Sequence, residues 1–262
     1  MIKRKNVLSK LILDTAGDIP FKEAQVVIHQ PTIKELSMIG GEQAMLIAAE
    51  TLTKDYQNLD EVAKMSVTNF DIIMMIMKKN ETIKKIVNDI LFLLFPDYQI
   101  IYTPTSILLQ EVTTKTTSII DQANFEIFAN IIYSIFCLEE FWGEGSIQDY
   151  NPSGPRAAAL VEKFKKKKEL LAEMKRQRGD TDENESLLQR YLSILAVGEN
   201  KDKNILSNYT VFQLIEEYKR FIRKEEFDFT VSAKLAGAQK IKDAKDWMTN
   251  IQFGVNNNNQ TD

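Results

Sequence analysis

Cysteine and histidine are nearly absent from this chain of 262 residues, which contains one of each. Because Cys137 is alone, no disulfide can form within the chain, and cytosolic conditions suit such a protein. A zinc site made of paired Cys and His ligands is not expected either. His29 lies at the end of a short apolar stretch, just before Pro31, so we interpret it as a surface or strand-end residue rather than a catalytic base.

Phosphate-binding loops and long apolar runs are also missing. Neither G-x-G-x-x-G nor G-x-x-x-x-G-K-[ST] occurs, so the sequence predicts no nucleotide cofactor. The uncharged run Ile127 to Leu138 has 12 residues, which is short of the ~20 that span a bilayer. Glu139 and Glu140 are adjacent and would point about 100° apart on a helix, so they do not form a two-carboxylate site. We therefore expect no enzyme, no metal, no cofactor and no membrane segment.

The composition is that of an ordinary globular protein. Hydrophobic residues make up 44% of the chain and charged residues 27%, so most of the chain should bury a core. The net charge of -4 argues against nucleic-acid binding over the whole surface. The length allows one large domain or two modest ones.

Helix start signals recur in the first half of the chain. Thr32 and Glu35 have the spacing of a capping box, and Thr68 and Asp71 repeat that pattern. Residues 41–52 fit either a helix or a strand, and we favour the helix. These segments predict a core built largely from helices.

A small β component interrupts the helical pattern. Residues 98–112, split by Pro104, are rich in β-branched and aromatic side chains and predict an antiparallel hairpin. Residues 24–30 (AQVVIHQ) are a candidate short strand, and helical periodicity returns at Asp121 and continues to about Phe141. The predicted fold is mainly α, with helical bundle-like lobes and a small antiparallel β-hairpin in the N-terminal lobe.

Proline and glycine divide the chain into parts. Residues 1–142 form the predicted N-terminal lobe, and residues 143–155 (GEGSIQDYNPSGP) form a Pro/Gly hinge. Residues 156–178 read as a basic exposed helix, followed by a C-terminal helical lobe over residues 185–252. Residues 253–262 (FGVNNNNQTD) have no periodicity and are predicted to be a disordered tail.

The basic helix carries nine Lys/Arg against three Glu over residues 156–178. A solvated or protein-contacting face, a nucleic-acid grip and a flexible linker are all compatible with this run, and aromatic stacking partners are scarce. We favour the first and regard nucleic acid as an unlikely partner. The candidate charged contact face consists of Lys165, Lys166, Lys167, Lys168, Arg176 and Arg178.

The C-terminal lobe has the clearest helical patterns, over residues 186–200, 208–227 and 233–252. Thr210 and Gln213 have capping spacing, and apolar residues recur every three or four positions. Such stripes form either an ordinary helical core or a groove for a partner, and periodicity does not separate the two. The candidate partner-binding side chains are Phe212, Ile215, Tyr218, Phe221, Trp247 and Met248.

Several stretches resemble the tail assembly chaperones of long-tailed bacteriophages that infect Gram-positive hosts. They are PTIKELSMIGGEQ, NFEIFANIIYSIF, the linker YNPSGPRAAALVEKFKKKKELLAEMK, SLLQRYLSILA, YTVFQLIEEYKRF and KLAGAQKIKDAKDWMTNI. The resemblance covers most of the chain but consists of helix patterns and a linker, so it transfers no site residues.

The resemblance implies a self-associating helical protein of the host cell cytoplasm that is absent from the finished particle. Its expected partners are the tape measure protein, which it keeps soluble, and the tail tube protein, which it helps to recruit. Two alternatives remain: a structural tail or baseplate accessory protein of the virion, and a nucleic-acid-associated regulator acting through the helix Lys163–Arg178.

Overall fold

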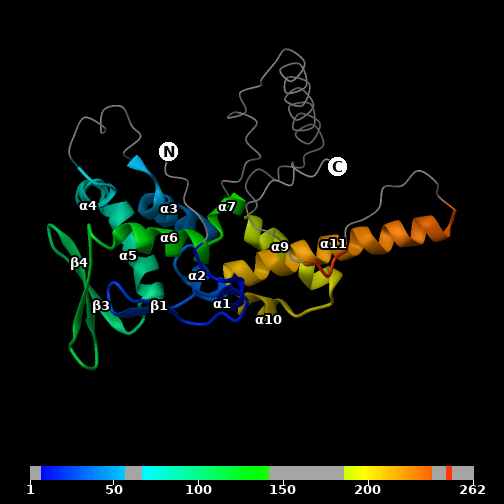
Figure 1. Ribbon diagram of the computed structural model, residues 1–262, viewed down its shortest axis with the longest axis horizontal. Coiled ribbons are helices and arrows are strands. Elements are labelled where there is room, and N and C mark those ends of the chain that lie inside the picture. The colour runs from blue at the N-terminus through cyan, green and yellow to red at the C-terminus, as the bar shows by residue number, and fades with distance from the viewer. Residues whose placement is uncertain (1–6, 57–66, 142–185, 238–245, 250–262) are drawn as a thin grey trace, which may run out of the picture. The chain divides into compact units, whose positions relative to one another are not determined.

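The structure, a computed structural model, describes residues 7–56, 67–141, 186–237 and 246–249 (Figure 1). It is mainly helical, with two small antiparallel sheets, as the sequence predicts. The predicted hinge at 143–155, the basic helix at 156–178 and the tail at 253–262 lie outside the described residues.

The chain divides into two compact units. Met1–Cys137 and Leu187–Gln252 together form the first, and Leu138–Ser186 with Phe253–Asp262 form the second. The second unit contains the short helix α7 (Leu138–Phe141). Most of the two lobes that the sequence separates, residues 1–142 and 185–252, therefore belongs to one unit. The reason is a set of contacts between residues far apart in sequence, described below.

The first unit begins with short elements. Helix α1 (Lys10–Asp14) precedes an antiparallel pair of strands, β1 (Ile19–Phe21) and β2 (Val26–Ile28), and helix α2 (Ile33–Met38) follows. Both strands alternate buried, exposed and buried side chains, so the pair covers the core with one face. The strand expected in residues 24–30 is confirmed, whereas its partner β1 was not predicted.

Four longer helices carry most of the core: α3 (Gly41–Thr53), α4 (Asn69–Lys79), α5 (Glu81–Leu94) and α6 (Phe125–Ile135). The capping boxes at Thr32 and Thr68 are both confirmed, and residues 41–52 are helical. Helix α6 ends earlier than expected, because buried Cys137 adopts a left-handed backbone with φ of 48°.

Aromatic rings join these helices to the first sheet. The ring of Phe128 on α6 stacks at 6.0 Å on Phe21 of β1 and at 6.0 Å on Phe95, the residue after α5. Phe125 lies 5.2 Å from Phe70 of α4. All five rings are buried, so helices and sheet share one core.

The second sheet has three strands, β3 (Tyr98–Tyr102), β4 (Ser106–Glu111) and β5 (Thr117–Asp121), in the order β3-β4-β5 (Figure 1). Both neighbouring pairs are antiparallel. The hairpin predicted over residues 98–112 is present as β3 and β4, and β5 is an additional strand.

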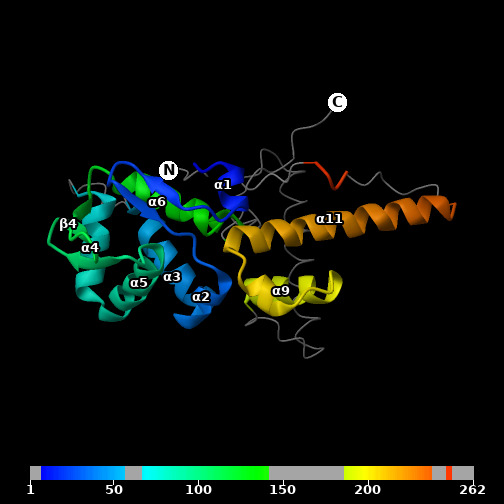
Figure 2. The same cartoon turned by 90° about the horizontal axis from the view of Figure 1, so that it is seen from below.

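The last elements are α9 (Leu187–Gly198), α10 (Lys203–Ser207) and α11 (Val211–Leu235). Figures 1 and 2 show α9 alongside the first part of α11. The first predicted segment matches α9. The second and the start of the third are one helix, because nothing between residues 227 and 233 interrupts helical geometry. Trp247 and Met248 form a turn, so the helix predicted through them is wrong at that point.

Candidate functional site

Helices α9 and α11 form the part of the molecule in which the sequence places most candidate binding residues. Helix α11 begins with a capping box, in which the Thr210 hydroxyl accepts a hydrogen bond from the Gln213 N–H at 3.3 Å and the Gln213 side chain accepts one from the Thr210 N–H at 2.9 Å. The predicted cap is thus confirmed.

The N-terminus of α9 is held by a distant residue. The carboxylate of Glu42, on α3, accepts hydrogen bonds from the backbone N–H groups of Leu187 at 3.1 Å and Leu188 at 2.7 Å. The negative charge of Glu42 also interacts favourably with the positive end of the helix dipole and so stabilises α9. Because the residues are more than 140 positions apart, no local sequence pattern reveals this cap.

Only the start of α11 is buried. Its buried residues are Val211, Phe212, Leu214, Ile215 and Glu216. Phe212 and Ile215 are 1% and 0% exposed, so these two candidates belong to the core and a partner cannot reach them in this structure. Their apolar spacing is the core alternative that the sequence left open.

Glu216 is the centre of an ion-pair cluster with Lys10 and Arg220 that connects α11 to α1. Its Oε1 atom lies 2.9 Å from Lys10 Nζ and accepts a further charged hydrogen bond from Arg220. Burial alone would raise the pKa of Glu216, but the hydrogen bonds from Arg220 and Lys10 outweigh it and hold that pKa below its ordinary value. The Arg220 guanidinium also donates to the Trp247 carbonyl at 3.1 Å, which ties the last described turn to α11.

A second ion-pair cluster ties the chain after α9 to α11. Lys201 Nζ lies 2.7 Å from Glu199 Oε2 and 2.7 Å from Glu217 Oε1. Partial burial opposes the charge on Lys201, but its two carboxylate partners prevail and raise its pKa. The two clusters thus hold adjacent residues of α11, Glu216 and Glu217, to different parts of the chain.

Two of the remaining candidates make the α9–α11 contact. The Tyr218 ring stacks on the Tyr191 ring of α9, with centroids 3.8 Å apart and planes 12° apart. The Phe221 ring lies against the Cα of Gly198, where an added Cβ would stand 2.3 Å from the ring. Both rings are half-buried, so each packs on α9 and keeps one side in solvent.

Beyond these contacts α11 is open to solvent. We define its distal segment as residues 224–235; none of its side chains is buried, and it extends past α9 in both views (Figures 1 and 2). Phe229 is 71% exposed and Leu235 is 85% exposed, and Val231 is exposed as well. Met248 is exposed and Trp247 half-buried in the nearby turn.

The charged candidates are not part of this arrangement. Lys165, Lys166, Lys167, Lys168, Arg176 and Arg178 lie outside the described residues. The structure therefore places Tyr218, Phe221, Trp247 and Met248 on or near one helix, and adds Phe229, Val231 and Leu235, which the sequence reading did not select. Phe229, Val231 and Leu235 do not form a single apolar stripe along the helix, so apolar periodicity does not reveal them.

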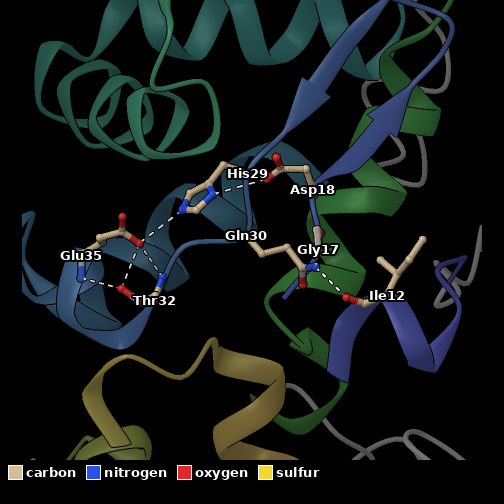
Figure 3. A network of polar contacts seen from close by, with 7 residues as sticks. All are labelled: Ile12, Gly17, Asp18, His29, Gln30, Thr32 and Glu35. Atoms are coloured by element: carbon tan, nitrogen blue, oxygen red, sulfur yellow. Dashed lines mark hydrogen bonds and ion pairs between the residues drawn. The ribbon is translucent and has the colours of Figure 1, made fainter. Parts of the chain in front are cut away.

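The only histidine belongs to a structural network (Figure 3). The imidazole of His29 lies between the carboxylates of Asp18, at 3.7 Å from Nδ1, and Glu35, at 3.4 Å from Nε2. Next to it, the Gln30 side chain donates to the carbonyls of Ile12 at 3.0 Å and Gly17 at 2.6 Å. This network ties β2 to α1 and α2, in agreement with a strand-end role.

Burial also opposes ionisation of Glu35 in this network. Hydrogen bonds from Thr32 and His29 more than compensate, so the pKa of Glu35 lies below its ordinary value. Within residues 7–56, 67–141, 186–237 and 246–249, no group of acidic, His or Cys side chains could hold a metal ion. In the same residues no helix is long and apolar enough to cross a membrane.

A family model described as the YomV second domain matches residues 180–252, a segment that includes α9, α10 and α11. No curated protein and no solved structure matches the chain. The part of the chain that carries the candidate binding residues is thus similar to a YomV second domain.

Proposed function

We propose that the protein is a phage tail assembly chaperone, which acts in the host cell cytoplasm and holds the tape measure protein in solution until tail tube subunits replace it. The observation that supports this proposal best is the distal segment of α11, whose large apolar side chains at 229, 231 and 235 are exposed. Self-association and recruitment of the tail tube protein are part of the same proposal and rest on the family resemblance.

The chemistry of the distal segment suits a long helical client. Apolar contact is non-directional, so Phe229 and Leu235 can pack against many different helical surfaces without a fixed partner geometry. Each contact of this size is weak, and many copies along one client bind together through avidity. The charged residues Lys224 and Asp228 of the same segment pair with each other at 3.5 Å and keep the free helix soluble.

The base of the segment is rigid, which also favours binding. The Glu216 and Lys201 clusters and the Tyr191–Tyr218 stack hold the first half of α11, so little order has to be created there when a client binds.

Co-expression tests the proposal. The full chain and helical fragments of the tape measure protein from the same genome are produced together, and the soluble fraction and co-elution of the fragments are measured. We expect the chain to raise fragment solubility, and Phe229→Asp together with Leu235→Asp to abolish that gain. Val197→Asp is the matched control, because Val197 is equally exposed but lies on α9.

Three outcomes contradict the proposal. The first is that the fragments stay insoluble with the wild-type chain. The second is that the double variant solubilises the fragments as well as the wild type does. The third is the chain itself at stoichiometric level in purified particles, which favours a structural tail or baseplate protein instead.

A further inference from the structure

The hydrogen-bond phase of the three-stranded sheet determines which backbone groups face outward at its edges. Thr103 N–H bonds to the Ser106 carbonyl and Val112 N–H to the Asp97 carbonyl, both at 2.9 Å. In an antiparallel pair, bonded and non-bonded positions alternate. The N–H and C=O groups of Ile100 and Tyr102 therefore point away from β4, toward the free edge of β3.

The opposite edge of the sheet is closed at the C-terminal end of β5. Glu111 N–H bonds to the Thr116 carbonyl, so the backbone groups of Ile119 and Asp121 face outward on β5 by the same alternation. The buried side chain of Asn124 occupies one donor and one acceptor among them: its Oδ1 accepts from Asp121 N–H at 3.0 Å, and its Nδ2 donates to the Ile119 carbonyl at 2.9 Å. One side-chain amide thus takes the place that another strand would take.

The β3 edge has no such protection. No strand pairs with its outer side in the described part of the chain. Its sequence, YQIIY, contains no charged residue and no proline, and its five residues pair with β4 in unbroken register, without a bulge. Proteins normally protect edge strands with one of these devices, since an open edge is a template for another strand. Because one edge is capped and the other is not, we infer that the open edge of β3 is kept available for another strand.

The outer face of the sheet adds a specific side-chain preference. Ile101 lies opposite Leu108, and Leu108 lies opposite Ile119, so three aliphatic side chains form one row across the strands. Ile101 and Ile119 are exposed, and Leu108 is half-buried. The neighbouring row is Gln99, Gln110 and Thr117, which is uncharged. A further strand beside β3 would extend the aliphatic row with a residue next to Ile101.

We propose that the free edge of β3 binds an extended peptide segment of a partner protein by adding it to the sheet as a fourth strand. The peptide's backbone bonds to the N–H and C=O groups of Ile100 and Tyr102, and an aliphatic side chain packs beside Ile101 on the outer face. This site involves other elements than α11 and does not depend on the chaperone proposal.

A flexible segment fits this edge better than a second folded copy of the chain. A strand of five residues is about 17 Å long, and two folded proteins that meet through one such strand together bury far less than the roughly 1,600 Å² of a stable interface. A peptide can follow the strand and also cover the aliphatic row.

Binding of a defined probe to the full chain tests the site. The probe is a fluorescein-labelled peptide of alternating threonine and valine with two terminal lysines, and fluorescence anisotropy measures its affinity. Its matched control has the same side chains with alternate backbone nitrogens methylated, which removes donors. We expect the probe to bind and the methylated peptide to bind at least about tenfold more weakly.

Two variants of the chain target the edge. Ile100→Pro removes an outward-facing donor without touching the β3–β4 hydrogen bonds, since proline is accepted where the N–H faces away from the sheet. Ile101→Lys places a charge at the end of the aliphatic row. Each should weaken binding about tenfold or more, whereas Ile119→Lys, the same change at the far end of the row, should alter it less than about twofold.

The proposal is overturned if the methylated peptide binds as tightly as the probe, or if Ile101→Lys binds like the wild type. Equal loss in Ile119→Lys would assign binding to the face rather than the edge. Concentration-dependent dimers that disappear in Ile101→Lys, without peptide binding by the wild type, would assign the edge to a second copy and would also overturn it. Circular dichroism confirms that each variant is folded.

Discussion

Lys10 and Glu216, 206 positions apart in the chain, form an ion pair with 2.9 Å between Lys10 Nζ and Glu216 Oε1. Together with Arg220, Lys10 holds a buried carboxylate where α1 meets α11. Because the predicted N- and C-terminal lobes meet here, this pair is part of the reason that they form one compact unit.

Replacing this carboxylate by an amide should destabilise the fold. Glu216→Gln keeps the size of the side chain but removes the charge that Lys10 and Arg220 share, which should lower the free energy of unfolding by roughly 1–3 kcal/mol. Glu225→Gln is the matched control on the exposed side of the same helix and should change it by less than about 0.5 kcal/mol. Equal urea midpoints for Glu216→Gln and the wild type would show that the ion pairs of Glu216 do not stabilise the fold.

The same carboxylate makes stability depend on pH. The folded-state pKa values of Glu216 and Glu35 lie below the ordinary value of 4.5, so their contribution is present above that pH and is lost as the pH falls through the folded values. The stability gap between the wild type and Glu216→Gln should therefore narrow as the pH is lowered below 4.5. Urea unfolding at several pH values measures this, and a gap that stays constant or widens would be inconsistent with it.

Local features of this fold could be predicted, and long-range ones could not. The caps at Thr32, Thr68 and Thr210 were predictable, because each depends on a side chain and a backbone group three residues apart. The cap that Glu42 makes on α9 depends on tertiary packing, since the two lie far apart in the sequence. The cap that Asn124 makes on β5 depends on a strand edge that exists only once the sheet has formed. Sequence periodicity also could not distinguish buried Phe212 from half-buried Phe221, since both lie in the same repeating pattern.

The cap of α11 offers a test of how firmly the binding helix is held. Thr210→Ala removes the hydroxyl that accepts from Gln213 N–H and should cost about 1 kcal/mol, while Thr210→Ser should retain most of it. Thr230→Ala, a similar change within α11, is the control and should have little effect. Thermal unfolding followed by circular dichroism ranks the variants. A ranking in which Thr230→Ala is the most destabilised would refute the role of Thr210 as the N-cap of α11.

Asn124 gives a separate prediction for the closed edge of the sheet. Asn124→Ala leaves Asp121 N–H and the Ile119 carbonyl without their hydrogen bonds to this side chain and should destabilise the protein by roughly 1–3 kcal/mol. The neighbouring Gln122→Ala, an exposed change in the same turn, serves as the control. An unchanged free energy of unfolding in Asn124→Ala would mean that the hydrogen bonds from Asn124 to the edge of β5 do not stabilise the fold.

The central claim is that the distal segment of α11 contacts the tape measure protein. Hydrogen–deuterium exchange of the full chain, with and without a soluble helical fragment of that protein, tests it most directly. The account predicts slower exchange of the backbone amides in residues 224–235 when the fragment is bound, and no such slowing in Phe229→Asp. Binding of the fragment with unchanged exchange in residues 224–235 would contradict it.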